Sequence, residues 1–363
     1  MKKALKIILC VIAAVIIAAG CITYAFLPHP LSYDIDSIAS VGSDVSILGQ
    51  TQDSVTIRKN GDEDFKILMF TDMHLDGKNK TSNVTVDHLV KNIQREKPDL
   101  VLLGGDNVTS GMNRKRCSQL AQIFENLGVY WGGIIGNHEG DNSFSISREE
   151  MVDIFSSYDH CIMRKGVDSA DGNCNYSINI LNSDGTLKHT FFCLDTFDTL
   201  NEEQMKKYDV TGDGSHYDGV HENQIEWYNQ KVEQTKNIYG DFKSTVLIHI
   251  PIPQYKELAE KGDFLYGVNL EGVCASAFEP GLFEAIKASG TTTSVFCGHD
   301  HLNTFGAEYD GILLSYIEPS GYGAYGAKKL GYEEKDWLQG YTKLELKNDG
   351  TFEHTQIKNG AAQ

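Results

Sequence analysis

The chain carries little positive charge for its length. Its 363 residues include 32 lysine and arginine residues against 50 aspartate and glutamate residues, a formal net charge of −18. A surface this acidic argues against broad binding to nucleic acid or to anionic membrane surfaces. The sequence also contains no CxxC pair, so a structural zinc ribbon is not expected. Internal repeats and low-complexity tracts are likewise missing, which excludes repeat architectures.

Only the N-terminus contains a long hydrophobic run. Lys2, Lys3 and Lys6 precede the uncharged stretch Ile7–Leu27, which is long enough to span a bilayer. Because the lysines should stay cytoplasmic, we predict a signal anchor over residues 1–28 of a single-pass cell-membrane protein, with the remainder extracytoplasmic. A secreted product after signal cleavage, or a lipid anchor at Cys21, is the alternative. The length of the run exceeds that of a usual signal peptide and favours the uncleaved anchor.

The rest of the chain divides by composition into a tether and one domain. Residues 29–64 are polar and rich in serine and aspartate, which suits a tether from the membrane. Residues 65–363 alternate between β-rich runs and amphipathic patterns, as expected of βαβ units in an α/β domain. The predicted helices are Val84–Arg95, Cys117–Leu127, Arg148–Ser156 and Glu222–Gln234. The predicted hairpins join Asn175–Leu181 to His189–Thr196 and Tyr341–Leu346 to Thr351–Ile357.

Metal-binding residue types follow five of the apolar runs. Polar groups at several strand ends are typical of a site built on loops at one rim of a sheet. A single histidine after a strand is usually structural, but five such strand ends in one chain indicate a shared site. They are Asp72 and His74 after Phe65–Thr71, Asp106 after Leu100–Gly104, Asn137 and His138 after Tyr130–Ile135, His249 after Ser244–Ile248, and His299 and His301 after Thr293–Cys297.

The residue types indicate a centre of two transition metal ions. Imidazoles and carboxylates suit zinc, manganese and iron, whereas an all-carboxylate set would indicate magnesium or calcium. Asp106 has two oxygens and can bridge two cations, the arrangement that places hydrolytic metals roughly 3.5–4 Å apart. Asn137 offers a neutral oxygen, which keeps the ions electrophilic. We therefore predict two divalent ions drawn from manganese, iron and zinc.

In two motifs, a single residue separates a pair of predicted ligands. If Asp72 and His74 lie in extended backbone, their side chains point the same way and both reach one ion. The same reasoning applies to His299 and His301, although a turn between them would aim the two rings at different metals.

With these motifs in this order, the chain resembles the calcineurin-like metallophosphoesterase family over about Phe65 to Tyr325. Within the family it is similar to the purple-acid-phosphatase-like proteins of plants and fungi, through the stretches Lys66–His74, His249–Pro253 and Gly298–His301. The resemblance implies an α/β fold, a two-sheet β-sandwich of the metallophosphoesterase type with flanking helices. In this chain one N-terminal transmembrane helix would precede it.

The resemblance also assigns roles to the site residues. His138 would occupy the family's acid position beside the metals, with Glu139 as its supporting neighbour. True purple acid phosphatases place a tyrosine three residues after the bridging aspartate, and here that position is Thr109. A tyrosinate–iron centre is therefore not expected. One metal would be held by Asp72, His74, Asp106 and His301, and the other by Asp106, Asn137, His249 and His299.

These assignments imply a metal-dependent phosphoric ester hydrolase, either a phosphatase or a phosphodiesterase. A hydroxide bridging the metals would attack phosphorus in line, and His138 would donate a proton to the leaving oxygen. A small or partly shielded phosphorylated substrate suits the acidic surface better than a long polyanion. The alternative is a non-hydrolytic protein that binds a phosphoryl ligand on the same scaffold. The sequence specifies neither the substrate nor the oligomeric state.

Three further segments carry weaker signals. Gly321–Gly326 matches GxGxxG, but residues 327–340 show no clean helical face, so dinucleotide binding is not expected. Tyr322 and Tyr325 in this loop either shape the pocket or simply pack in a turn. The loop over residues 209–218 either overhangs the site or is inert. Cys161 and Cys174 flank another loop, and they are the one pair for which we predict a disulfide.

Overall fold

The structure is a computed structural model that describes residues 12, 15–17, 31–76, 79–109, 111, 113–141, 145–212, 216–326 and 338–359. The predicted anchor over residues 1–28 falls almost wholly outside these ranges. Within them, none of the helices combines the length and the apolar character needed to cross a bilayer. The anchor therefore stays a prediction from the sequence.

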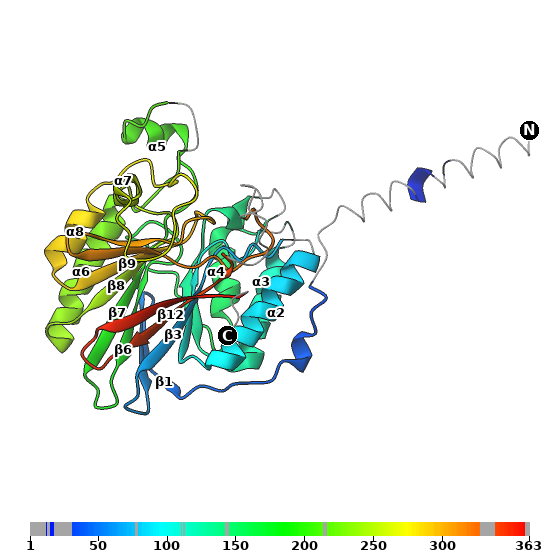
Figure 1. Cartoon of the computed structure of the whole chain (residues 1–363), viewed down its shortest axis with the longest axis horizontal. Coiled ribbons are helices and arrows are strands. Elements are labelled where there is room, and N and C mark those ends of the chain that lie inside the picture. The colour runs from blue at the N-terminus through cyan, green and yellow to red at the C-terminus, as the bar shows by residue number, and fades with distance from the viewer. Residues whose placement is uncertain are drawn as a thin grey trace, which may run out of the picture.

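Two β-sheets form the centre of the molecule (Figure 1). The first has eight strands in the order β1 (Val45–Gln50), β2 (Ser54–Lys59), β6 (Tyr176–Leu181), β7 (Leu187–Cys193), β8 (Ser244–Leu247), β9 (Thr292–Cys297), β11 (Ile312–Tyr316) and β10 (Gly306–Tyr309). The second has five strands in the order β13 (Phe352–Lys358), β12 (Gly340–Leu346), β3 (Phe65–Phe70), β4 (Leu100–Gly104) and β5 (Trp131–Ile134). The two-sheet α/β architecture expected from the resemblance is thus confirmed.

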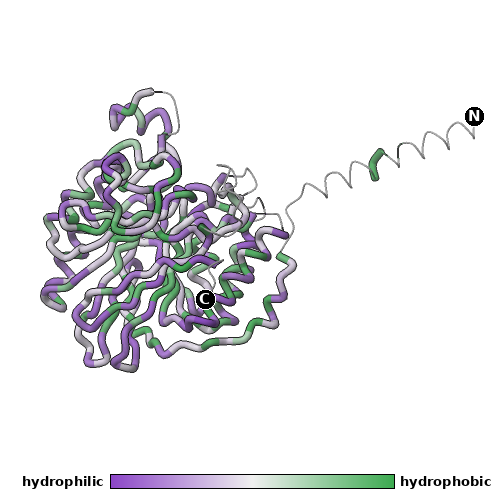
Figure 2. Tube along the Cα trace, viewed as in Figure 1, coloured by the Kyte–Doolittle hydropathy of each residue, from purple (hydrophilic) through white to green (hydrophobic). Residues whose placement is uncertain are grey.

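Helices cover both sheets. Helices α2 (Asn79–Glu96), α3 (Asn113–Leu127) and α4 (Arg148–Ser156) share a hydrophobic core with the five-stranded sheet. Helices α6 (Glu222–Tyr239), α7 (Gln254–Lys261) and α8 (Leu282–Ser289) pack with the eight-stranded sheet in a second core. In Figure 2, hydrophobic and hydrophilic residues alternate along α2, as expected of a helix with one buried face. All four predicted helices and both predicted hairpins are confirmed.

Side chains along the central strands point alternately into two different hydrophobic cores. In β8, Leu247 belongs to the core shared with the five-stranded sheet, whereas Val246 belongs to the core under α6 and α8. Phe296 and Val295 in β9 divide in the same way. Successive side chains of a strand point to opposite faces, so the central strands β8 and β9 of the eight-stranded sheet are buried on both sides. This explains why Val246–Ile248 and Val295–Cys297 are continuous apolar runs in the sequence.

The predicted tether is wrong over much of its length. Strands β1 and β2 pair antiparallel, and β2 pairs in parallel with β6, so residues 45–59 belong to the eight-stranded sheet. Alternation explains this placement, because Val55 and Ile57 are fully buried between more exposed neighbours. The polar composition that indicated a tether reflects the outward-facing residues of an edge hairpin.

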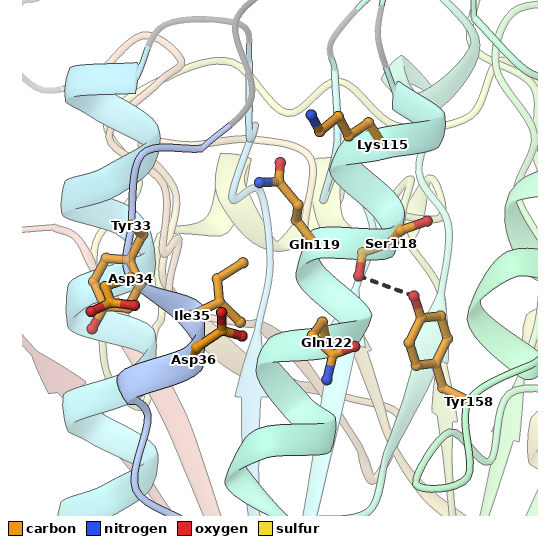
Figure 3. Close-up of a pocket in the computed structure, with 9 residues that line it drawn as sticks. All are labelled: Tyr33, Asp34, Ile35, Asp36, Lys115, Ser118, Gln119, Gln122 and Tyr158. Atoms are coloured by element: carbon orange, nitrogen blue, oxygen red, sulfur yellow. Dashed lines mark hydrogen bonds between the residues drawn. The ribbon is translucent and has the colours of Figure 1, made fainter.

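The segment before β1 also lies on the domain. The short helix η1 (Ile35–Ser37) contacts α3, and Asn126 of α3 donates a hydrogen bond to the carbonyl oxygen of Ile35. A pocket of about 440 Å³ lies between this segment and α3. Tyr33, Lys115 and Tyr158 are among the residues that line it (Figure 3). None of the predicted ligands lines this pocket.

The predicted disulfide is wrong. Cys161 and Cys174 are both free and buried. Cys161 lies in a β-bridge with Trp131 at the edge of the five-stranded sheet, whereas Cys174 lies near the charges of Asp195 and Arg148. The loop that separates the cysteines in the sequence does not bring their sulfur atoms together.

Candidate metal centre

The strand ends that carry the predicted ligands meet at one place. Strands β3, β4 and β5 run parallel, as do β8 and β9, so the residues that follow them emerge at the carboxyl edges of the two sheets. Two clusters form there, and within each cluster the potential ligand atoms lie within 4.8 Å of one another. The first contains Asp72, His74, Asp106 and His301, and the second contains Asp106, His249 and His299.

The first cluster draws on both sheets. Nε2 of His74 lies 3.0 Å from Nε2 of His301 and 3.5 Å from Oδ2 of Asp106. Oδ1 of Asp72 lies 3.5 Å from Nε2 of His301. These nitrogen and oxygen atoms lie close enough to one another to serve as ligands of one ion.

The second cluster shares Asp106 with the first. Oδ2 of Asp106 lies 3.2 Å from Nε2 of His249. Asn137 joins this group, because its Oδ1 lies 3.1 Å from Nε2 of His249 and 2.9 Å from Nδ1 of His299. The structure therefore brings all seven predicted ligands together, in the two groups that the resemblance implies.

The turn considered for His299 and His301 is present. His299 has a left-handed backbone with φ of 79° and belongs to the second cluster, while His301 belongs to the first. The backbone at Asp72 and His74 is left-handed and not extended, with φ values of 54° and 41°, so the condition considered for this pair does not hold. Their side chains still reach the same cluster. Asp106 is left-handed as well, with φ of 51°.

This backbone geometry has an energetic cost. A non-glycine residue in the left-handed region costs about 1–3 kcal/mol, and such residues tend to gather at functional sites. Aspartate and histidine tolerate the region better than most residues. Four strained ligands within two clusters are therefore consistent with side chains aimed at a common target.

Two glycines allow the loops to approach one another. Gly136 precedes Asn137, and a β carbon there would collide with Oδ1 of Asp106. Gly105 has φ of +100°, and a β carbon there would lie 2.5 Å from Nδ1 of His249. Only glycine fits at these points of close approach.

Hydrogen bonds on the far side of two rings select which nitrogen faces the cluster. Nδ1 of His249 donates to the carbonyl oxygen of Gly104 at 2.8 Å. Nδ1 of His301 contacts the carbonyl oxygen of Tyr325 at 3.3 Å. In both rings Nε2 is left free to act as a ligand, an arrangement common in metal-binding histidines.

The electrostatics of the clusters favour ionised carboxylates. Burial disfavours a charged Asp106, but the neighbouring histidines, His249 first, hold the pKa of this carboxyl well below its usual range. Burial also disfavours a charged His249, yet the Asp106 carboxylate raises the pKa of His249 to about 10. Burial lowers the pKa of His299 to about 3 and that of His74 to about 4. Metal binding would therefore release a proton from His249.

The donor set fits the metals that the sequence predicts. Oδ2 of Asp106 is buried and has no well-aligned hydrogen-bond donor among the described residues, although Nε2 of His249 lies 3.2 Å from it. A buried polar atom without a hydrogen bond is costly, and a cation at the clusters would satisfy this oxygen. Mixed imidazole, carboxylate and amide ligands suit zinc, manganese or iron.

His138 lies beside the clusters without joining either of them. Its side chain is 41% exposed, and its ring centre lies 5.5 Å from that of His74. Its Nδ1 contacts Oδ2 of Asp141, three residues along the chain. Burial lowers the pKa of His138, but the carboxylates of Asp106 and Asp141 outweigh this effect and raise it above its ordinary value. The ring is therefore placed to hold a proton at the edge of the site.

Glu139 supports the ligand loops from behind. It is buried and accepts hydrogen bonds from the backbone amides of Asn107 at 2.6 Å and Gly136 at 2.8 Å. These amides flank the ligands Asp106 and Asn137. Burial, together with the nearby charge of Asp106, raises the pKa of Glu139 to about 7.

Two tyrosines border the clusters. Tyr325 stacks on His301 with ring centres 4.3 Å apart, and its hydroxyl donates to Glu271. Tyr217 packs edge-on against His299 at 4.4 Å. Of the two alternatives for the glycine-rich loop, a role in shaping the site is therefore favoured, and the loop that carries Tyr217 also reaches it.

Several supporting residues are not apparent from the sequence. Asp141 could have been suspected from its position three residues after His138, and Asp195 from its place after an apolar run. Arg148 opens a helix and carries no comparable signal, yet it lies behind Asn137 and contacts the carbonyl oxygen of Gly136.

Comparison with known proteins agrees with this geometry. Residues 65–303 match the family model described as calcineurin-like phosphoesterase. The chain is 30% identical over 302 residues to "Probable inactive purple acid phosphatase 14" of Arabidopsis thaliana, with 74% of each chain covered. It is 27% identical over 307 residues to "Probable inactive purple acid phosphatase 29" of the same plant, with 75% of each covered.

A solved structure shows the same fold. The crystal structure of a dimetal phosphatase from Danio rerio aligns with a TM-score of 0.51 and 14% identity, covering 82% of this chain and 99% of that one. The family expected from the five motifs is thus confirmed, together with its purple-acid-phosphatase-like relatives in plants. This chain belongs to the calcineurin-like phosphoesterase family.

Proposed function

We propose that this protein is a metal-dependent phosphoric ester hydrolase that acts on a small phosphorylated substrate. One observation carries the proposal: two ligand clusters share Asp106, and His138 stands beside them with a carboxylate partner. Phosphoester hydrolysis needs both a charged template for the phosphoryl group and a proton for the leaving oxygen. The site offers residues for each task.

The metal ligands and His138 would have separate roles in hydrolysis. Bound at the clusters, two divalent ions would supply Lewis-acid stabilisation of the phosphoryl oxygens and lower the pKa of water. Asp106 links the two positions, and the remaining six predicted ligands hold one position each. Asp141 holds His138 through Nδ1, which leaves Nε2 to donate a proton to the leaving oxygen.

The net charge indicates which substrates suit the protein, and the N-terminal lysines indicate its location. A net charge of −18 disfavours long polyanions such as nucleic acid. The lysines that precede the apolar N-terminal run support a membrane anchor with the domain outside the cytoplasm. A small extracytoplasmic phosphoester is the substrate class that fits both features.

A second candidate function is non-hydrolytic binding of a phosphoryl ligand. The names of the Arabidopsis relatives include the word "inactive", and this favours the alternative. Against it, the complete predicted ligand set and His138 converge in this chain. Loss of a ligand or of the acid would be the expected mark of a protein that only binds.

Phosphate release from a panel of alkyl and aryl monoesters and diesters tests the proposal. We expect no release after metal removal by a chelator, and recovery when manganese, zinc or iron is restored. A matched control is His160→Gln, because His160 pairs with Glu125 away from the clusters. Phosphoryl ligand binding without turnover in the metal-restored protein would support the binding function instead.

A further inference from the structure

A buried ion pair connects the two sheets behind the metal centre. Nη2 of Arg148 lies 2.5 Å from Oδ1 of Asp195. The Asp195 side chain is fully buried, and that of Arg148 is 16% exposed. Arg148 begins α4, which packs with the five-stranded sheet, whereas Asp195 follows β7 of the eight-stranded sheet. Burying two charges is costly unless additional hydrogen bonds satisfy them.

On one side the pair holds the backbone next to a predicted ligand. Nη1 of Arg148 donates to the carbonyl oxygen of Gly136, which belongs to the peptide that joins Gly136 to Asn137. The amide of Gly136 donates to Glu139 at 2.8 Å. Both polar groups of this glycine are therefore held, at the point where its backbone approaches Asp106 too closely for any β carbon. The direction of the Asn137 side chain depends on this peptide.

On the other side the pair is fixed to the eight-stranded sheet. Oδ2 of Asp195 accepts a hydrogen bond from the amide of Asn173 at 2.9 Å, and Oδ1 accepts one from the amide of Phe197 at 3.0 Å. The amide of Asp195 donates to Oδ1 of Asn175 at 3.1 Å. Asp195 is thus a rigid support, since both carboxylate oxygens and its backbone amide are engaged.

The second cluster has a particular need for such a connection. Asn137 follows β5 in the five-stranded sheet, whereas His249 and His299 follow β8 and β9 in the other sheet. The oxygen of Asn137 must stay within about 3 Å of both rings, as it does at 3.1 Å and 2.9 Å. A shift of the Gly136 peptide would move Asn137 away from both histidines, whereas Asp72, His74 and His301 of the first cluster follow β3 and β9 on other loops.

We propose that Arg148 and Asp195 are positioning residues that set the metal affinity of the second cluster through Asn137. The inference builds on the metal centre of the proposed function, but it requires only metal binding and not hydrolysis. Outer hydrogen-bond partners of metal ligands typically change metal affinity by 10–100-fold when removed. We expect Arg148→Met to weaken the second position by about that factor and to spare the first.

Calorimetric titration of the metal-free protein with Mn²⁺ tests this, with His249→Ala and His74→Ala as references for the second and first positions. Arg148→Lys keeps the charge but lacks the planar fork that serves two acceptors at once. We expect it to weaken the second position less than Arg148→Met. This graded order is not expected if Arg148 merely fills space.

A double variant distinguishes a specific loss of metal affinity from general loss of folding. Arg148→Met with Asp195→Leu removes both charges, so neither stays buried and unpaired, and buried pairs replaced in this way often keep their stability. The carbonyl oxygen of Gly136 still loses its donor, so the second position should stay weak. Lys231→Met with Asp53→Leu is the matched control, because that ion pair, at 2.7 Å and 15% and 9% exposed, involves none of the ligand loops.

The possible outcomes separate the two proposals. Wild-type affinity at both positions in the double variant, or equal weakening of both positions, would overturn the positioning role while leaving the metal centre intact. Selective weakening in a protein that releases no phosphate would support the positioning role and count against hydrolysis.

Discussion

Oδ2 of Asp106 and Nε2 of His249 lie 3.2 Å apart in the interior, although the two residues follow strands of different sheets. The same oxygen lies 3.5 Å from Nε2 of His74. Asp106 is thus the point at which both ligand clusters and both sheets meet. Its backbone amide and carbonyl are placed by a left-handed conformation that aspartate tolerates better than most residues.

Substitution of the shared aspartate should affect both metal positions. We expect Asp106→Ala to lower metal occupancy at both, whereas His249→Ala should weaken only the second, because an imidazole nitrogen serves a single ion. Metal analysis after dialysis against limiting metal measures the difference. Two tightly held ions in Asp106→Ala would rule out the bridging role.

His138 should matter for turnover and not for metal binding. We expect His138→Ala to retain both metals while turnover falls about 10²–10⁴-fold, the usual contribution of a general acid. The loss should be larger for alkyl phosphates, whose leaving oxygen needs a proton, than for an activated aryl phosphate. Rate measurements with both substrate types, together with metal analysis, check this. An equal loss for both leaving groups would contradict the proton-donor role, and loss of metal would make His138 a ligand.

The loop that carries Tyr217 should lose stability as the pH rises. His221 lies between Asp218 at 2.9 Å and Asp171 at 3.0 Å, and its ring stacks on Phe197. Burial lowers the pKa of His221, but the two carboxylates outweigh it and raise the pKa above its ordinary value. Stability from the charged ring is therefore fully present below about pH 6.5, the unfolded value, and is lost as the pH rises through the folded value.

His221→Gln tests this linkage. At about pH 5.5 the variant should lose about 1.5–3 kcal/mol of unfolding free energy, as expected for hydrogen bonds to a charged group. The difference from the wild-type protein should shrink as the solution becomes alkaline. Urea unfolding at a series of pH values provides the measurement, and a difference that grows with rising pH would contradict the assigned sign.

The predicted anchor has a direct topological test. Because Lys2, Lys3 and Lys6 should remain in the cytoplasm, protease added to intact cells or spheroplasts should digest the domain and leave a short membrane fragment. Detection with one antibody against the N-terminus and one against the domain distinguishes the two products. Complete protection of the domain in sealed cells would overturn the extracytoplasmic location.

All seven predicted ligands lie together in the structure, and the sequence could indicate them because each one follows a strand that is visible as an apolar run. Strand ends and residue types are local properties, and β4, for example, occupies the predicted range Leu100–Gly104 without change. Hairpins and amphipathic helices are also local, and they were predicted correctly for the same reason. The family resemblance then assigned each ligand to one of two groups.

Other features depended on contacts that no local pattern records. Strand β2 pairs with β6, more than a hundred residues later, so a segment with the composition of a tether became part of a sheet. The distance between Cys161 and Cys174 in the sequence said nothing of where their loop would place them. Both predictions, the tether and the disulfide, were wrong because each inferred a long-range contact pattern from the composition of a short segment.

The sequence by itself determined which residues could bind metal and at which strand ends they stand. Only the tertiary structure decided how these side chains come within contact distance of one another, because that depends on left-handed turns at Asp72, Asp106 and His299 and on the order of strands within two sheets. The Arg148–Asp195 pair belongs to the same category, since its partners are 47 residues apart in the chain. A buried charge can be recognised as paired only when the fold has brought its counter-charge to it.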